Sequence, residues 1–335
     1  MADSRRGDDV AELVARARTA DARAVARLIS LVESGVTPGG SGSAAGGESP
    51  LSREVAVALA QYGGHAQVVG LTGSPGVGKS TTTSALVSSL RAADKQVGVL
   101  AVDPSSPFSG GALLGDRVRM QEHATDRGVF IRSMASRGQL GGLSAAVPQA
   151  LRVLDAAGCD VVLIETVGVG QAEVEIASLA DTTIVLLAPG MGDGIQAAKA
   201  GILEIADVFV VNKADRDGAD QVARDLRYMQ SLGGRHSDAG AWRPPIVKTV
   251  ASRSEGIDDV VAAIAKHLDW MKRHGELDRR RRARAASEIE AIALGGLRQR
   301  FAGVHGSAAL DTAAARVVRG ETDPYTAADE LVASL

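Results

Sequence analysis

The sequence predicts an α/β protein in which a mostly parallel sheet carries helices on both faces. Between about residues 67 and 252, short apolar runs typical of buried strands alternate with stretches whose apolar residues recur at helical spacing. The glycine-rich segment GSPGVGKS, at 73–80, lies between the first strand and the first helix of this alternation. Helical patterns alone precede and follow it, so we expect one α/β domain with helical additions at both ends.

The first 62 residues are expected to form a helical region with a linker inside it. Apolar residues recur at helical spacing over residues 8–33, and a helical pattern resumes over about 51–62. The stretch TPGGSGSAAGGESP, at 37–50, separates the two. Its glycine and serine content cannot bury enough surface to order it, which predicts a flexible linker.

Seven apolar runs predict the strands of the sheet, within a domain that we assign to residues 63–272. The runs are QVVGLT, QVGVLAVD, VFIRSMA, DVVLIET, TTIVLLAP, DVFVVNKAD and PPIVKTVAS. Ligands of open parallel sheets bind beyond the carboxyl ends of the strands. The residues that follow these runs are therefore the candidates for a functional site.

The segment GSPGVGKS fits G-x-x-x-x-G-K-[ST], the phosphate-binding loop of nucleotide hydrolases, and it has the required strand before it and helix after it. Such a loop points backbone N–H groups at an anion, and the helix dipole adds to the field. Lys79 is expected to act in catalysis by reaching the β- and γ-phosphates, and the Ser80 hydroxyl to bind Mg²⁺. The residues expected to surround the phosphates are Gly73, Ser74, Pro75, Gly76, Val77, Gly78, Lys79, Ser80 and Thr81.

The segment NKAD, at 212–215, follows its own strand and indicates that the base is guanine. Asp215 would accept hydrogen bonds from N1–H and the 2-amino group of guanine. Adenine lacks both donors, and each lost bond to a charged group costs roughly 1.5–3 kcal/mol. Asn212 is expected to brace the loop, and Lys213 to lie along the base. A further segment after the last strand is expected to meet guanine O6 through its backbone; its residues are Ala251, Ser252 and Arg253.

Three acidic residues are candidates for a metal site. Asp103 ends the second strand, and Asp116 lies in the Gly-, Pro- and Ser-rich loop that follows, whose composition suits a nucleotide-dependent change of conformation. Glu165 ends the fourth strand and precedes Gly168, which resembles the D-x-x-G element of GTPases with Glu in place of Asp. We expect these carboxylates to orient Mg²⁺ or its waters, with Glu165 also serving catalysis; the alternative is that they are solvated loop charges.

Hydrolysis is expected to be slow without help. In Ras-like GTPases a glutamine directly after the D-x-x-G glycine orients the attacking water. Val169 stands there in this chain, and Gln171 lies two residues further on. Lys199, in the loop APGMGDGIQAAK, is a candidate to offset the charge of the transition state, although it could equally be a lysine on a helix surface.

Residues 273–335 read as a helical arm. Its apolar residues have no evident place in the sheet; they are Ile289, Ile292, Leu294, Leu297 and Phe301. An exposed apolar stripe is unfavourable in water, and pairing with the same arm of a second copy would bury it, so we expect a homodimer. The alternative is that the arm folds back on its own domain. The run RRRRAR at 279–284 is flanked by acidic residues, which favours a solvated helix face or a subunit contact over nucleic-acid binding.

Composition limits the ligands that the protein can bind and the compartment in which it is expected to work. The net charge of −3 argues against nucleic-acid binding through a global basic field, and the single cysteine, Cys159, excludes a disulfide framework and a cysteine metal cluster. No apolar run approaches the length of a membrane span, and the polar N-terminus lacks a signal-peptide core. We therefore expect a cytoplasmic protein.

Five segments together resemble the methylmalonyl-CoA mutase-associated GTPases, also labelled MeaB or ArgK type, over roughly residues 50–300. They are GSPGVGKST, AVDPSSPFSGGALLGDRVRM, ETVGVGQ, APGMGDGIQAAKAGI and NKAD. The resemblance implies a P-loop G domain flanked by N-terminal helices and a C-terminal dimerisation arm. It implies a GTP-driven chaperone that gates cofactor loading of an adenosylcobalamin-dependent mutase and protects that enzyme. The family's metal acids correspond to Asp103, Asp116 and Glu165.

Other functions remain open on the sequence. Members of this family are also labelled as kinases of amino-acid transport components. Such a kinase would use ATP, and Asp215 would not favour adenine. A metal-insertion GTPase, such as one that delivers nickel, would usually carry Cys or His clusters, and this chain has one Cys and six scattered His. A signal-recognition GTPase would need a methionine-rich module, which is absent. The base-off cobalamin signature D-x-H-x-x-G is also absent, so the partner rather than this chain would hold the cobalamin.

Overall fold

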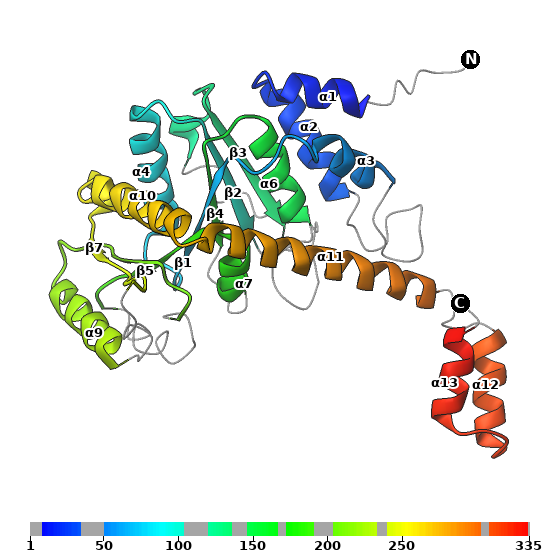
Figure 1. The fold of residues 1–335 in the computed structure, drawn as a ribbon. Helices are drawn as coiled ribbons and strands as arrows, with labels where there is room; N and C mark the ends of the chain where they lie inside the picture. The colour runs from blue at the N-terminus through cyan, green and yellow to red at the C-terminus, as the bar shows by residue number, and fades with distance from the viewer. Residues whose placement is uncertain are drawn as a thin grey trace.

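The computed structural model describes residues 9–34, 50–103, 120–135, 146–166, 172–190, 204–232, 240–302 and 308–333. In these residues a central sheet lies between two layers of helices, and a long helix runs from the body toward a separate helical pair (Figure 1). This architecture confirms the α/β fold class, the flanking N-terminal helices and the helical arm.

The sheet has seven strands in the order β3-β2-β4-β1-β5-β6-β7, and every pairing is parallel. Each strand lies within one of the seven predicted apolar runs. Their bounds are β1 (Gln67–Thr72), β2 (Val97–Asp103), β3 (Val129–Ala135), β4 (Val161–Thr166), β5 (Thr182–Leu187), β6 (Val208–Val211) and β7 (Ile246–Lys248). Because all strands point the same way, their carboxyl ends form one edge of the sheet and their amino ends the other.

One face of the sheet shares a hydrophobic core with the N-terminal helices. Leu28 and Val55 of those helices belong to the same buried cluster as Phe130, Leu154 and Ile164 of the α/β domain. By strand alternation, the cluster under α9 lies on this face too. The helices on this face are α1 (Val10–Ala17), α2 (Ala22–Ser34), α3 (Pro50–Leu59), α6 (Ala146–Ala156), α7 (Ala172–Leu179) and α9 (Ala219–Leu232).

The helical pattern over residues 8–33 is divided into α1 and α2, a break that the apolar spacing does not predict. Ala20, between them, has a positive φ of 60°. Asp21 then accepts hydrogen bonds from the backbone N–H groups of Arg23 and Ala24 and so begins α2. Apolar spacing cannot reveal such a break, because the buried residues continue at helical intervals on both sides of it.

The other face is covered by α4 (Lys79–Ala92) and α10 (Ile257–Arg273). Their buried residues, such as Leu86 and Val260, pack against Leu71, Leu163 and Ile184 of the sheet. Thus α4, which begins at the phosphate-loop motif, is fixed against the central strands. That contact sets the position of its N-terminus relative to the strand ends.

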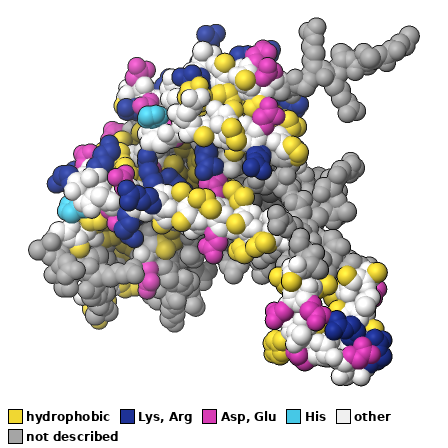
Figure 2. Space-filling view, turned by 45° about the vertical axis from the view of Figure 1, so that its right-hand side comes forward, with side chains coloured by type: hydrophobic (Ala, Val, Ile, Leu, Met, Phe, Trp, Pro, Cys, Tyr) yellow, Lys and Arg dark blue, Asp and Glu magenta, His cyan; other side chains and the backbone are white. Residues whose placement is uncertain are grey.

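The arm consists of α11 (Glu276–Ala302), followed by α12 (Ala308–Val318) and α13 (Pro324–Ala333). The first part of α11 lies against the body, and α12 and α13 pack on each other at its far end (Figure 1). Figure 2 shows this pair as a separate knob below the main body, with hydrophobic side chains on the surface between the two. Four of the five predicted arm residues are exposed: Ile289 (67%), Ile292 (44%), Leu294 (45%) and Leu297 (50%). The Phe301 side chain lies outside the described part.

Candidate nucleotide-binding site

The phosphate-loop motif forms a tight turn between β1 and α4. Gly73 has a φ of +143°, and a Cβ there would lie 2.3 Å from the carbonyl oxygen of Leu186, so only glycine fits. Gly78 caps α4 in the left-handed conformation, with φ +100°. The predicted residues Gly73 to Thr81 therefore form this loop and the first residues of α4, where the positive end of the helix dipole favours an anion.

Lys79 is folded across this loop. Lys79 is only 8% exposed, and its ammonium donates hydrogen bonds to the carbonyl oxygens of Gly73 and Ser74. These acceptors are neutral, and a phosphate oxygen would be a stronger partner for the charge. The contacts hold the Lys79 ammonium against the loop at which the sequence predicts the β- and γ-phosphates.

Asn212 joins three loops at the carboxyl edge. Its side-chain amide donates to the carbonyl of Val77 (2.8 Å), and its side-chain oxygen accepts from the backbone N–H of Ala251 (3.0 Å) and the hydroxyl of Thr249 (3.1 Å). A Cβ on Gly78 would lie 2.4 Å from the same amide nitrogen. The phosphate loop and the segments after β6 and β7 are therefore held in one arrangement. Thr249 was not predicted, because only the fold brings it to Asn212.

Lys213 and Asp215 lie beside this junction. Lys213 has a left-handed φ of +56°, and its ammonium donates to the carbonyl of Gly76 (2.7 Å). Asp215 lines an open pocket of about 270 Å³ together with Lys248, Arg253 and Glu255. The Asp215 carboxylate lies 3.6 Å from the guanidinium of Arg253, which also pairs with Glu255 at 2.8 Å. Of the predicted base-binding residues, Asp215 and Arg253 line this pocket, and Ala251 and Ser252 belong with Arg253 to the adjoining 3₁₀ turn, η4 (Ala251–Arg253).

Glu165 lies at the end of β4, next to the phosphate loop. It is 1% exposed, and its Oε2 accepts a hydrogen bond of 2.5 Å from the hydroxyl of Thr83 on α4. In register it is paired with Leu71 of β1 and Ala101 of β2, so Asp103 follows at the same edge. Carboxylate and hydroxyl oxygens are the donors that Mg²⁺ prefers, so Glu165 and Ser80 fit the predicted site in their chemistry.

The described residues contain no group of three Asp, Glu, His or Cys side chains that could hold a metal ion. The side chain of Asp103 lies outside the described part. The other predicted residues outside it are Asp116, Gly168, Val169, Gln171 and Lys199.

Cys159 takes no part in this site. It is buried among the core residues shared with the N-terminal helices. Burial raises the pKa of its thiol to about 12, and Asp155 and Asp160 add to the effect. A buried, protonated thiol is a poor nucleophile at neutral pH.

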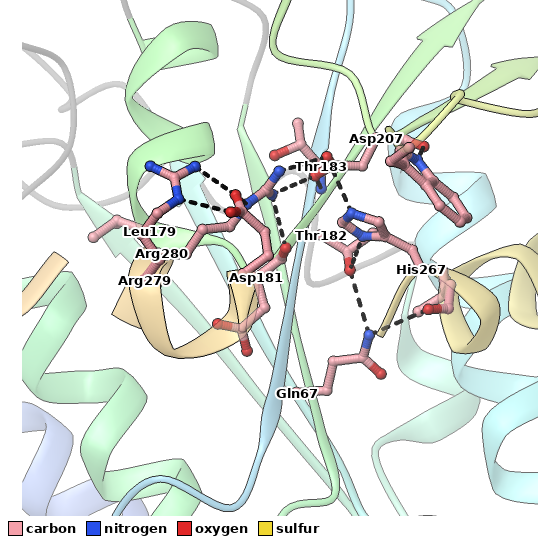
Figure 3. Close-up of polar contacts among 12 residues, drawn as sticks. Gln67, Leu179, Asp181, Thr182, Thr183, Asp207, His267, Arg279 and Arg280 are labelled. Atoms are coloured by element: carbon pink, nitrogen blue, oxygen red, sulfur yellow. Dashed lines mark hydrogen bonds and ion pairs between the residues drawn. The ribbon is translucent and has the colours of Figure 1, made fainter. Parts of the chain in front are cut away.

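A second polar centre, which no motif in the sequence marks, lies at the opposite edge of the sheet. Asp181 and Asp207 directly precede β5 and β6 and are almost fully buried. Arg280 of α11 donates to both carboxylate oxygens of Asp207, at 2.8 and 2.9 Å (Figure 3). Arg281 and Arg284 pair with Asp181 at 3.1 and 3.4 Å. Burial opposes the charge on Arg280, but the hydrogen bonds to Asp207 raise its pKa above the ordinary value.

His267 of α10 completes this centre. Its Nδ1 lies 2.9 Å from the hydroxyl of Thr182, and its Nε2 lies 3.3 Å from a carboxylate oxygen of Asp207 (Figure 3). Burial lowers the pKa of His267 to about 4, against the opposing effect of Asp207, so the ring is neutral at pH 7. Three arginines of the run at 279–284 therefore bind buried carboxylates of the α/β domain in the same chain. The prediction of a solvated face or a subunit contact was wrong for these three, because the buried carboxylates come from distant strands.

Comparison with known proteins shows the family to which this chain belongs. Residues 25–305 match the family model described as "Methylmalonyl Co-A mutase-associated GTPase MeaB". A "Putative GTPase" of Pyrococcus abyssi is 44% identical over 321 residues, covering 96% of this chain and 95% of its own. The "Methylmalonic aciduria type A homolog, mitochondrial" of Caenorhabditis elegans is 37% identical over 215 residues, covering 64% of this chain and 54% of its own. A solved structure described as a "LAO/AO transport system kinase" has a TM-score of 0.68 and 27% identity, with 96% of each chain covered.

Proposed function

Because the chain belongs to the methylmalonyl-CoA mutase-associated GTPase family, whose activity is GTP hydrolysis, we propose that it is a GTP-driven chaperone of an adenosylcobalamin-dependent methylmalonyl-CoA mutase. It would gate the loading of the cofactor and protect the loaded enzyme. The names of the family and of the Caenorhabditis elegans relative support this role.

The observation that carries the nucleotide assignment is the Asn212 bridge. It ties the phosphate loop at Val77 to the turn at Ala251, and the Asp215 pocket opens beside it. A carboxylate in that pocket pairs with the two donors on the edge of guanine and has no match on adenine. Guanine selectivity is therefore built into the same junction that holds the phosphates.

The hydrolytic groups have separate tasks in this proposal. Lys79 leaves the carbonyls of the loop and offsets charge on the β- and γ-phosphates. Mg²⁺, when bound, would neutralise the phosphate oxygens; Ser80 and Glu165 would hold it, together with Asp103 and Asp116. Lys199 is the proposed source of a further positive charge. With Val169 in place of a water-orienting glutamine, intrinsic turnover is slow and the mutase raises it.

Homodimerisation through the arm belongs to the same proposal. The four exposed apolar residues of α11 lie beyond its arginine anchor, where the described part of the body does not cover them. Pairing with the arm of a second copy would bury them. Leu294→Glu together with Leu297→Glu should give a monomer in light scattering, whereas Val57→Glu, at an exposed position of α3, should leave a dimer. A monomeric wild-type protein at micromolar concentration would refute the dimer.

The partner is tested by mixing the purified protein with a cobalamin-dependent methylmalonyl-CoA mutase and GTP, a non-hydrolysable GTP analogue, GDP or ATP. We expect a complex with the guanine nucleotides, faster GTP hydrolysis in the complex, and GTP-dependent transfer of adenosylcobalamin to the apo-mutase. Lys79→Ala should abolish the GTP-dependent step. A mutase that changes neither the hydrolysis rate nor the loading of its cofactor would contradict the chaperone role and leave the GTPase assignment intact.

No helix in the described part of the chain is long and apolar enough to span a lipid bilayer. We infer that the chain works in the cytoplasm without nucleic acid, in keeping with its net charge of −3 and its anchored arginines.

The solved relative is named as a transport kinase, and a kinase activity is therefore the alternative function. Transfer of phosphate to a protein acceptor, with ATP preferred over GTP, would favour that alternative.

A further inference from the structure

Thr83 and Glu165 form a buried contact that the phosphate-loop motif does not require. Thr83 lies one helical turn after Lys79 and is fully buried, as is nearly all of Glu165. The Thr83 hydroxyl oxygen lies 2.5 Å from Oε2 of Glu165 and 3.1 Å from the carbonyl oxygen of Lys79. A hydroxyl has one proton, and the shorter contact to a charged acceptor is the stronger, so Thr83 donates to Glu165.

The sheet directs Glu165 toward this helix. Successive side chains of β4 point to opposite faces. Leu163 packs in the same cluster as Leu86 of α4, whereas Ile164 packs with the helices of the other face. Glu165 therefore shares the α4 face with Leu163. On that face it meets the hydroxyl of Thr83, which comes from the helix that also carries Lys79.

We propose that Thr83 is a positioning residue for nucleotide hydrolysis: its hydroxyl holds the Glu165 carboxylate in the orientation that receives Mg²⁺ with the nucleotide. This inference rests on the proposed role of Glu165 at the nucleotide site. One oxygen of the carboxylate is fixed by Thr83, so the group cannot rotate freely, and the first turn of α4 is tied to the end of β4. The phosphate loop and the carboxylate are thereby kept in register.

The test compares variants that keep or remove this hydroxyl. Thr83→Val removes it with little change of shape, and Thr83→Ser keeps it. Thr82→Val is the matched control, because Thr82 is equally buried in the same helix but its hydroxyl donates to the carbonyl of Gly78 at 2.9 Å. Each full-length variant is measured for GDP affinity by calorimetry with and without Mg²⁺, for GTP turnover over a range of Mg²⁺ concentrations, and for its thermal midpoint.

We expect Thr83→Val to need about tenfold more Mg²⁺ for half-maximal turnover and to lose most of the Mg²⁺-dependent gain in GDP affinity, as expected for one bond to a charged group. GDP affinity without Mg²⁺ should be nearly unchanged. Thr83→Ser should restore both properties, and Thr82→Val should lower the thermal midpoint without the Mg²⁺ effect. If Thr83→Val and Thr82→Val behave alike, or if Thr83→Ser fails to restore Mg²⁺ dependence, Thr83 has only a structural role.

Glu165→Gln separates this inference from the proposed function. If Glu165→Gln loses the response to Mg²⁺ while Thr83→Val keeps it, the positioning role is overturned and the site assignment stands. If Glu165→Gln keeps the wild-type response, the assignment of Glu165 fails, and the inference about Thr83 fails with it.

Discussion

The two edges of the sheet hold their charged side chains in opposite ways. At the carboxyl edge, Lys79 rests on neutral carbonyls and Asp215 faces an open pocket. At the amino edge, Asp181 and Asp207 are buried and paired with arginines of α11. Charges that exchange partners during a reaction need weak, replaceable contacts, whereas charges that anchor a helix need matched partners that remain in place.

The energetic consequence differs in the same way. Removing one member of a buried ion pair leaves the other desolvated, so the amino edge should be costly to alter. Removing the charge of Lys79 or Asp215 at the carboxyl edge should leave the folded state nearly intact and weaken a ligand instead. Stability and nucleotide binding should therefore respond separately to mutations at the two edges.

The largest expected effect is on stability at the amino edge. Arg280→Ala strands the buried Asp207 carboxylate and should lower the free energy of unfolding by about 3–5 kcal/mol, measured by urea denaturation. Both tryptophans, Trp242 and Trp270, lie in a ring cluster with His267, so intrinsic fluorescence reports this region. Arg279→Ala is the control, because Arg279 is 72% exposed and pairs only with Glu276 among the described residues. A loss of stability no larger than that of the control would show that the anchor is weak.

The next effect is on turnover at the carboxyl edge. Lys79→Ala should lower GTP turnover by roughly 10²–10³-fold, because the charge that offsets the phosphates is lost. Phosphate release at saturating GTP measures it, and the urea midpoint should change little. Lys95→Ala, at a half-exposed lysine paired with Asp160, is the matched control. Wild-type turnover in Lys79→Ala would mean that the loop is not the active site.

A smaller effect concerns the choice of base. The protein should bind GTP and GDP more than about tenfold more tightly than ATP, since two hydrogen bonds to a charged group are at stake. Asp215→Asn should weaken guanine binding and admit xanthine nucleotides, while Asp217→Asn, on the exposed part of the same loop, should change neither. Equal affinities for GTP and ATP in calorimetry would rule out guanine selectivity.

The smallest effect is a pH dependence at the amino edge. The pKa of His267 is about 4 in the folded state and about 6.5 when unfolded, so the unfolded chain binds the extra proton between these values. Its contribution is fully present above pH 6.5 and is lost as the pH falls toward 4. Between pH 6.5 and 5.5 it should remove about 1 kcal/mol of stability. The difference between wild type and His267→Gln across this range isolates the effect, and parallel curves would contradict it.

The features that the sequence predicted are those that depend on neighbours in the chain. Each of the seven strands lies within one of the predicted apolar runs. The phosphate loop was predicted from its glycine spacing, and its backbone has conformations that only glycine adopts without a clash. The NKAD segment was placed at a strand end, and the structure brings it to the phosphate loop through Asn212. In these cases the sequence motif and the local structure that it predicts involve the same few residues. In a parallel sheet, the topology itself brings the carboxyl ends of the strands together at one edge.

The pairing of charged side chains depends on the tertiary structure. The sequence shows a basic run at 279–284, but the carboxylates that bind it precede β5 and β6, far away in the chain. In the sequence, Thr83 is one of three consecutive threonines and nothing distinguishes it. In the structure, the packing of α4 against β4 brings it within hydrogen-bond distance of Glu165. Local periodicity determines where strands and helices form, because hydrophobic burial acts on every apolar residue. The partner of a buried polar group depends on the packing of whole elements, and no local pattern in the sequence records that packing.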